Sequence, residues 1–508
     1  MTVELPGLTV QVAAPSVQLP PPLRTDVAGF LGATRRGPAG MPVRVEGLNG
    51  YRDVFGDLDP NALTSYAIQE GYFPNGGDLA WVVRVAGAGT PCGTQWDVSD
   101  LAGFSAAVYD VVASSPGAWA EGGQVTIWYR SDSLVGPAEV DVRVAIPGEP
   151  VEAFTRIPAD QVAEQLAAAS KLIRLGPAAG PAAGAAAAGP AGPARRFKVS
   201  ELILTGGTDV PPDVNDYLAA VDALADQPEV AIVAAPDLGG HLTDQGQRQE
   251  VVSELLSTAA DRLDRLVLLD VPADQAAPAD ALSWAATMLP ADPVQRRAGA
   301  VYYPGLLVSD PLGGVTAPLR AIPPSGHVAG VISQLDRDRG AWYSPANVVL
   351  EEAVDLDPPL TDSEQEAVFG AGLNLLRCAP GRGLQVWGGR TLDPGHLYVA
   401  HRRLLHRLVR AVHGVADPLV FDVNGPELRL TLVRAVTSVL LAAFRAGGLA
   451  GSRPQDSFQV VCDNTNNPPG ADPGQVVCDI AVAPAVPMEF IRLRLLVSQQ
   501  SQLEVTET

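Results

Sequence analysis

Apolar and polar residues alternate at both ends of the chain with the two-residue period of a β-strand. The alternating apolar residues are Leu8, Val10 and Val12 near the N-terminus and Ile491, Leu493, Leu495 and Val497 near the C-terminus. Neither segment has an adjacent hairpin partner, so its backbone groups must pair elsewhere. We therefore expect two extended arms, residues 1–22 and 488–508, that add strands to sheet edges, including those of another subunit.

Between the arms, short apolar runs alternate with helical patterns, which is typical of a partly parallel sheet. The expected strands include Val27–Ala33, Trp81–Val85, Val230–Ala235, Leu266–Asp270 and Ala300–Val308, and the expected helices include Thr243–Leu263 and Ala281–Leu289. The pattern predicts a multidomain α/β (α+β mixed) fold. Its middle domain would combine residues 23–90 and 196–340.

Two further regions differ from this pattern. Residues 91–195 carry strand signals and one helical stretch, Ala159–Leu172, which predicts an inserted outer domain. That domain would end in a Gly/Ala/Pro-rich surface loop at 176–195, because this stretch has no large apolar side chain to bury.

Residues 341–487 form the expected C-terminal domain. They contain two strong helical patterns, Val399–Val412 and Glu427–Arg445, followed by strand patterns at Phe458–Cys462 and Val476–Ala483. Gly447 and Gly448 follow the second helix as a stop signal.

Charge narrows the range of partners. The formal net charge is −22, so the overall field of the protein does not attract nucleic acid or an anionic membrane. No apolar run approaches the ~20 residues of a membrane span. The N-terminus shows no signal-peptide pattern.

The four cysteines are Cys92, Cys378, Cys462 and Cys478. Since none forms a CxxC pair, we interpret them as reduced thiols. Cys462 and Cys478 could face each other across a hairpin, and the sequence leaves their pairing open.

The sequence carries few signs of catalytic chemistry. The chain has no GxxxxGK[ST], HExxH, GxSxG or CxxC motif. Asp237, His241 and Asp270 follow predicted strands, where α/β enzymes place catalytic groups, and a hydrolase-like site near Asp237 and Asp270 is the alternative function. We favour loop caps and turns instead, and we expect no catalytic residues, cofactor or metal site.

The helix Val399–Val412 carries an unusual concentration of positive charge. Its basic residues, with His413 just beyond it, include Arg402, Arg403, His406, Arg407, Arg410 and His413. No acid occurs from 396 to 413 in a chain with 57 acidic residues. Basic side chains with no acidic partner on the same helix repel one another. We therefore interpret this stripe as an interaction surface for an acidic partner rather than as a solvated face, and the histidine spacings of five and seven exclude a metal pair one turn apart.

The sequence also resembles the phage tail sheath family, which includes the sheaths of extracellular contractile injection systems. The matching stretches, in chain order, are Leu5–Val10, Val27–Pro38, Tyr72–Val85, Val301–Gly314, Pro323–Val331 and Arg339–Leu350, followed by LTDSEQ, NLLR, PGRGLQVWGGRTL and YVAHRRL through Leu404. Together they cover about two thirds of the chain, and residues 91–195 show no such resemblance.

This resemblance implies a structural protein rather than an enzyme. Sheath subunits stack as hexameric rings around an inner tube, link through their terminal arms, and contract to drive the tube outward. The partners implied are further copies of the chain, an inner tube protein, and baseplate and cap proteins. The resemblance also implies assembly in the bacterial cytoplasm, with or without later release as an extracellular particle or virion tail. The C-terminal domain would be the inner, tube-facing one, with the basic helix lying toward the tube.

Overall fold

The computed structural model describes residues 24–131, 137–178, 196–393, 395, 398–417, 424–470, 475–485, 491–498 and 504–507, the last two stretches as backbone only. Contacts divide the chain into two units, with residues 24–407 in one and the residues from 408 onward in the other. The predicted N-terminal arm with Leu8, Val10 and Val12 lies outside the described residues, as does most of the Gly/Ala/Pro-rich stretch at 176–195.

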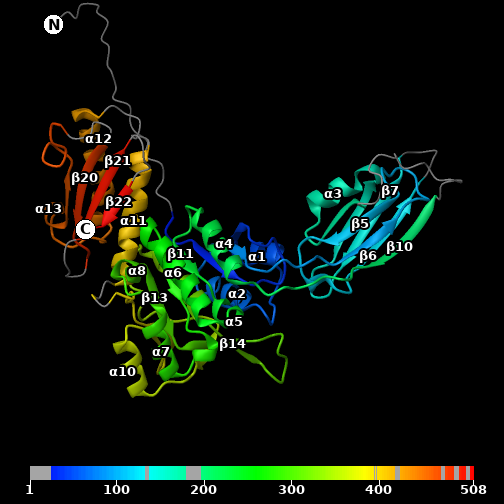
Figure 1. Cartoon of the computed structure of the whole chain (residues 1–508), viewed down its shortest axis with the longest axis horizontal. Helices are drawn as coiled ribbons and strands as arrows, with labels where there is room; N and C mark the ends of the chain where they lie inside the picture. The colour runs from blue at the N-terminus through cyan, green and yellow to red at the C-terminus, as the bar shows by residue number, and fades with distance from the viewer. Residues whose placement is uncertain are drawn as a thin grey trace, which may run out of the picture. The chain divides into compact units, whose positions relative to one another are not determined.

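An eight-stranded, mostly parallel sheet organises the first unit (Figure 1). In spatial order its strands are β18 (Gly383–Trp387), β17 (Asn374–Ala379), β13 (Gly299–Tyr303), β12 (Leu266–Leu269), β11 (Ile232–Ala234), β1 (Ala28–Gly32), β3 (Leu79–Arg84) and β2 (Pro42–Glu46). The neighbouring pairs from β17 to β3 are parallel, and the edge strands β18 and β2 are antiparallel to their neighbours. The partly parallel sheet predicted from the sequence is confirmed.

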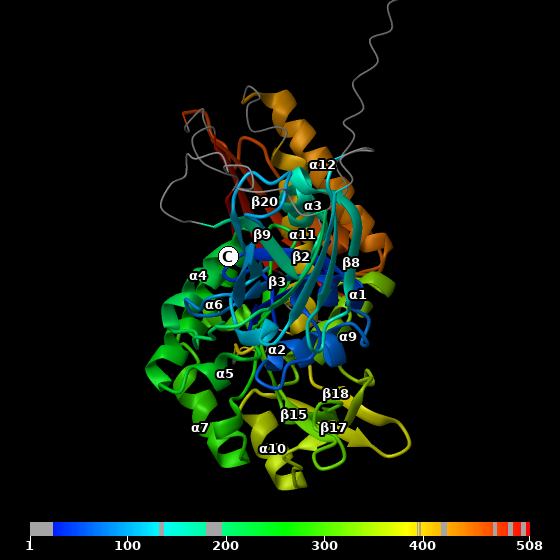
Figure 2. The ribbon, with the colours of Figure 1, turned by 90° about the vertical axis from the view of Figure 1, so that its right-hand side faces the viewer.

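Helices cover both faces of this sheet, so its central strands are buried on both sides. The helices of this unit are α1 (Gly47–Phe55), α2 (Leu63–Tyr66) with a continuing π-helical turn (Ala67–Tyr72), α4 (Val214–Ala225), α5 (Leu238–His241), α6 (Gln245–Arg262), α7 (Pro278–Met288), α8 (Pro293–Arg297), α9 (Ser325–Asp338) and α10 (Asp362–Gly370). Figure 2 shows α4, α6 and α7 gathered on one side and α1 and α9 on the other.

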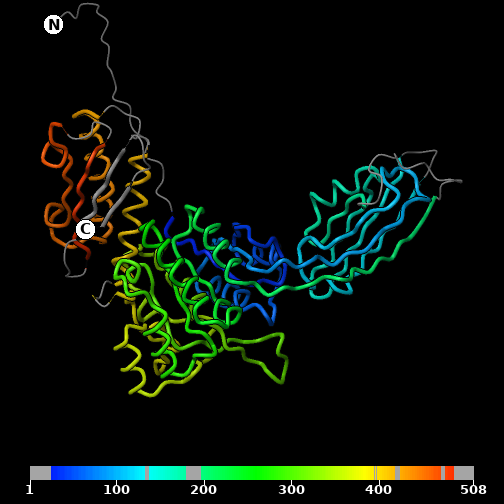
Figure 3. Tube along the Cα trace, viewed as in Figure 1, coloured from blue at the N-terminus to red at the C-terminus, as the bar shows by residue number. Residues whose placement is uncertain are grey.

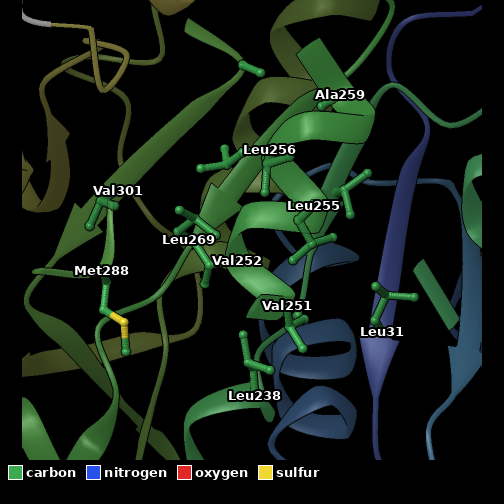
Figure 4. Packing of buried hydrophobic residues seen from close by; sticks show 14 of the residues in the cluster. Leu31, Leu238, Val251, Val252, Leu255, Leu256, Ala259, Leu269, Met288 and Val301 are labelled. Atoms are coloured by element: carbon green, nitrogen blue, oxygen red, sulfur yellow. The ribbon is translucent and has the colours of Figure 1, made fainter. Parts of the chain in front are cut away.

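The two-residue period of the strands divides the apolar core in two. On β12, Val267 and Leu269 belong to the cluster under α4, α6 and α7, which Figure 4 shows around Leu255 and Leu256. Leu266 and Leu268 belong to the cluster on the opposite face. Each such buried side chain contributes about 1.5–3 kcal/mol, so both faces hold the sheet in place.

Two predicted boundaries around the central sheet are wrong. Ala300–Val308 is not one strand: β13 ends at Tyr303, and β14 (Gly305–Ser309) pairs in a small antiparallel sheet with β15 (Leu319–Ile322) and β16 (Ala353–Asp357). Pro304 lies between β13 and β14 and has no N–H to donate to a ladder. The domain boundary at 340/341 also fails, because β17 and β18 extend the central sheet and the division between the units falls at 407/408.

The inserted domain has its own β-rich core. Its elements are β4 (Gly93–Asp97), β5 (Val108–Ala113), β6 (Gln124–Arg130), β7 (Glu139–Ala145), β8 (Glu152–Pro158), α3 (Val162–Ala169), β9 (Ile173–Pro177) and β10 (Phe197–Ile203). They form a four-stranded sheet, β10-β6-β7-β8, and a three-stranded sheet, β4-β5-β9, around a separate apolar cluster. Because β10 pairs with β6, this domain runs past the predicted limit of 195, and the chain leaves it after β10 (Figure 3).

The second unit contains two helices and a four-stranded antiparallel sheet. Its elements are the end of α11 (Val399–Ala416), which begins in the first unit, then α12 (Pro426–Arg445), α13 (Pro454–Ser457), β19 (Phe458–Val461), β20 (Gln475–Val482), β21 (Ile491–Ser498) and β22 (Glu504–Glu507). The sheet order is β19-β20-β21-β22, and α12 packs against β19. The helices and strands predicted here from the sequence are confirmed.

Candidate functional site

The residues proposed for the alternative enzyme site lie near the carboxyl ends of β11 and β12. A cavity of about 110 Å³ opens there, lined by Leu268, Asp270, Trp284, Tyr302 and Ile322 among others. This is the edge at which α/β enzymes bind their ligands. Whether it is a site depends on what its polar groups already bind.

Asp237 is a structural carboxylate. Its side chain is almost fully buried and accepts hydrogen bonds from three backbone N–H groups: those of Ala33 at 2.8 Å, Leu63 at 2.7 Å and Thr64 at 3.0 Å. Leu63 and Thr64 open α2, so the carboxylate satisfies donors at a helix start that has no cap of its own. Asp237 thus connects the end of β1 to the start of α2, and its carboxylate oxygens already accept hydrogen bonds from the backbone.

The close packing around Asp237 explains why Gly32 precedes Ala33. A Cβ atom on residue 32 would lie 2.0 Å from Oγ1 of Thr64 and 2.7 Å from Oδ2 of Asp237. Only glycine leaves room for this approach.

Asp270 and His241 have partners too. Asp270 accepts from the Ser325 N–H at 3.1 Å and from the Ser325 hydroxyl at 2.5 Å, at the first residue of α9. Burial raises the pKa of Asp270 to about 7, and the hydrogen bonds from Ser325 oppose that rise. His241 Nδ1 lies 2.8 Å from the hydroxyl oxygen of Tyr217. The interpretation of these three residues as capping and turn groups fits these contacts, with the difference that Asp237 is buried rather than solvated.

Among the described residues, no three His, Cys, Asp or Glu side chains are grouped so that they could hold a metal ion. In the same residues no helix is long and apolar enough to cross a membrane.

The basic stripe of α11 does not form the exposed surface expected from the sequence. Arg402, Arg403, His406 and Arg410 are each at most 2 % exposed. Arg407 and His413 are half-buried, and the Arg407 guanidinium lies 5.6 Å from the centre of the Trp342 ring. The prediction of an exposed basic stripe is therefore wrong for four of its six residues. The acid-free sequence shows that basic residues are concentrated on this helix, but it does not show whether their side chains are buried or exposed.

Arg403 is one of these buried basic residues, and it has an acidic partner on another helix. Its Nη2 group forms an ion pair with the Asp336 carboxylate of α9, and it donates to the Thr25 carbonyl oxygen at 2.6 Å. Both side chains of the pair are nearly inaccessible to solvent. Burial raises the pKa of Asp336, and Arg403 opposes that rise. Asp336 lies on α9, 67 residues before Arg403, so the acid-free sequence around Arg403 gives no sign of this partner.

Two exposed basic side chains of the second unit lie on α12. Leu432, Val436 and Leu440 bury one face of this helix. The opposite face exposes Arg434 and Arg445. The helical period of three to four residues could have indicated this face from the sequence.

The C-terminal segment forms the strand that its alternation predicts. Ile491, Leu493, Leu495 and Val497 all lie in β21, which pairs antiparallel with β20 from Gln475↔Ser498 to Val482↔Ile491. β22 then pairs with β21. In the single chain the C-terminal arm therefore adds to the sheet of its own chain, where β21 pairs with β20. Pairing of this arm with another subunit stays a prediction.

Comparison with known proteins identifies this architecture. Residues 212–392 match the family described as the phage tail sheath protein central domain. The tail sheath protein of Vibrio phage KVP40 is 28 % identical over 188 residues, which are 35 % of this chain and 26 % of that protein, so the match spans about a quarter of the relative's length.

Two solved structures share the fold across nearly the whole chain. The sheath tail protein of Listeria innocua superposes with a TM-score of 0.65 at 13 % identity, covering 94 % of this chain and 96 % of its own. The helical sheath of the anti-feeding prophage in its contracted state gives a TM-score of 0.55 at 18 % identity, covering 96 % and 98 %.

The chain therefore has the multidomain α/β fold of these two sheath structures. In residues 212–392 the chain is similar to the central domain of the phage tail sheath family. The resemblance noted in the sequence is confirmed.

Proposed function

We propose that this chain is the sheath subunit of a contractile, phage tail-like injection particle. It polymerises as stacked hexameric rings around an inner tube and contracts to drive the tube outward. The observation that carries the proposal is the sheath central domain at 212–392, set in a chain whose fold matches a contracted sheath over 96 % of its length. The occupied carboxylates of Asp237 and Asp270 supply no competing active site. The free energy for contraction would come from the difference between two packings of the same subunits.

The terminal arms are proposed to link the subunits. β21 is held on β20 by main-chain hydrogen bonds along the strand. An identical strand from a neighbouring copy can make the same bonds, so exchange conserves the pairing while joining two chains. Residues 1–22 would act similarly on another sheet edge. Such links let rings rotate and stay connected, as contraction requires.

Deletion of residues 489–508 tests this link. We expect a folded chain that no longer forms tubes, because the β20 edge then receives no strand. Negative-stain microscopy measures assembly, and circular dichroism checks the fold. The matched control replaces residues 179–195 with a short Gly-Ser linker and should assemble normally. Tubes of normal length from the arm deletion would contradict strand linkage at this end.

We propose that the second unit faces the inner tube and that its contacts with the tube come from α12 rather than from α11. Reversing the charge of Arg402 or Arg410 would place a carboxylate at a buried position, so that change reports on folding. Arg434 and Arg445 are exposed and can change sign without cost to the core. An acidic tube surface would pair with them, each contact contributing about 0–1 kcal/mol. Summed over many subunits, weak contacts hold the sheath in register yet release on contraction.

The double variant Arg434→Glu/Arg445→Glu should yield empty or prematurely contracted sheaths, because the tube no longer templates the extended state. Electron microscopy of particles made with the tube protein measures the filled fraction, and raised salt should lower that fraction for the wild type. Arg262→Glu, an exposed reversal on α6, is the control and should leave particles filled. Tube-filled, extended particles from the double variant would show that this face of α12 points elsewhere.

A further inference from the structure

Cys462 and Cys478 are directly opposite each other in the sheet of the second unit. β19 and β20 pair with the register Val460↔Ile480 and Val461↔Asp479, which places residue 462 across from residue 478. Both cysteines are thiols in the structure, and both are buried, at 7 % and 0 % exposed. The sequence left open whether Cys462 and Cys478 face each other, and the strand register shows that they do.

The hydrogen-bond pattern brings the two side chains close. The N–H of Ala483 donates to the carbonyl of Ser457, so the odd-numbered residues of β20 direct their backbone groups toward β19. Cys462 and Cys478 therefore form a non-hydrogen-bonded pair, in which the Cα atoms of antiparallel strands are about 4.5 Å apart. That separation lies within the range that a disulfide spans, about 4.4–6.8 Å.

The connection between the strands is held by two asparagines. The Asn467 side chain donates to the Val477 carbonyl at 2.7 Å and accepts from the Val477 N–H at 2.7 Å. Asn466 donates to the Val461 carbonyl at 2.6 Å. These bonds fix the chain on both sides of the cysteine pair, so bond formation needs no large backbone movement.

The two thiols differ in reactivity. A hydrogen bond with Cys478, followed by the positive charge of Arg429, lowers the pKa of Cys462 against the effect of burial. The same hydrogen bond and burial raise the pKa of Cys478. The thiolate is the reactive form of cysteine. Cys462 is therefore the thiol that an oxidant attacks first, and Cys478 is the thiol that then reacts with the oxidised Cys462.

We propose that Cys462 and Cys478 are a built-in modification site that a peroxide converts to an intramolecular disulfide between β19 and β20. The Cys462 sulfur attacks one peroxide oxygen and breaks the O–O bond, giving a sulfenic acid and one water. The Cys478 sulfur then attacks the Cys462 sulfur, and the departing hydroxyl takes the Cys478 proton as a second water. Two thiols and one hydrogen peroxide become one disulfide and two waters.

The link would change the strand that anchors the C-terminal arm. β20 pairs with β19 on one side and with β21 on the other. A covalent bond to β19 stops these two strands from separating, so the β20 edge on which β21 pairs is retained. The thiols persist where reductants keep cysteines reduced and become linked where oxidants prevail.

The test uses the full chain carrying Cys378→Ser, which removes an exposed thiol able to link molecules. The protein is treated with hydrogen peroxide, quenched, denatured, alkylated and digested for mass spectrometry. We expect the alkylated forms of Cys462 and Cys478 to disappear together and a peptide pair joined at these residues to appear, lighter by two hydrogens. Cys92, which is also buried but lies in the inserted domain, should stay alkylated.

Two variants separate the steps. In Cys478→Ser, the Cys462 sulfenic acid should persist and react with dimedone, whereas in Cys462→Ser the Cys478 thiol should survive treatment. Recovery of both cysteines as alkylated thiols, at a peroxide dose that oxidises Cys462 in the Cys478→Ser variant, would overturn the proposal. So would a link from either cysteine to Cys92 or to a second molecule. The first measurement needs no substitution in the sheet of the second unit, so its result holds even where a Cys462 or Cys478 variant fails to fold.

Discussion

Replacing Asp237 with alanine is expected to lower the free energy of unfolding by about 3–5 kcal/mol, which is among the largest single-residue effects in proteins. The carboxylate accepts from the N–H groups of Ala33, Leu63 and Thr64 in a buried position. Its removal leaves three donors without an acceptor, and each such buried group costs about 1–3 kcal/mol. Denaturant unfolding followed by circular dichroism measures the loss.

Asp244→Ala provides the matched control. Asp244 is an exposed aspartate seven residues further along, and it caps α6 by accepting a single bond from the Gln247 N–H at 2.9 Å. Loss of one exposed cap costs about 1 kcal/mol. Asp237→Asn retains one acceptor oxygen but turns an amide donor toward the backbone donors, so it should also destabilise. An Asp237→Ala variant as stable as the Asp244→Ala control would show that water replaces the carboxylate.

Replacing Arg403 with methionine is expected to cost about 3–5 kcal/mol, because it leaves the Asp336 carboxylate buried without its ion-pair partner. The double variant Arg403→Met/Asp336→Leu should recover most of this loss, because no unpaired charge remains. Arg337→Met is the control, since Arg337 lies next to Asp336 in the chain but pairs with Asp78 at 3.6 Å on the surface. A surface pair of this kind contributes about 0–1 kcal/mol.

The pH dependence of the Arg403→Met variant has a definite sign. Burial already raises the pKa of Asp336 above its ordinary value of 3.8, and Arg403 opposes the rise. Without Arg403 the folded-state pKa rises further, so the folded state holds a proton that the unfolded state releases. Stability then falls as the pH rises from about 4 through the folded-state pKa. The difference between the variant and the wild type should shrink at pH 5 relative to pH 8, and a constant difference would show that Asp336 has another cation partner.

The elements with strong local periodicity were predictable. The two-residue alternation of Ile491 to Val497 predicted a strand and β21 is one, and the apolar stripe of Val399–Val412 predicted the helix α11. Strand–helix alternation predicted the parallel sheet, because each element needs an apolar face to bury against the next.

Boundaries that depend on pairing were less predictable. Residues 374–387 join the central sheet only because β17 lies beside β13, 70 residues or more earlier in the chain. The strand β10 belongs with β6 across the Gly/Ala/Pro-rich stretch for the same reason. Periodicity predicts that a segment is a strand and which of its residues share a face. It does not predict which other strand pairs with that segment in the sheet.

The candidate site divides in the same way. The concentration of arginine on one acid-free helix is a property of the sequence, and so is the ordered series of motifs that resembles the sheath family. The direction in which Arg403 points is not, because its partners Asp336 and Thr25 are 67 and 378 residues away. The role of Asp237 likewise depends on N–H groups 173 to 204 residues distant. A buried polar group persists only where a partner satisfies it. The sequence by itself therefore determined the elements, the charge and the resemblance to the sheath family. Only the tertiary structure decided which charged groups hold the interior together and which, such as Arg434 and Arg445, are exposed to a partner.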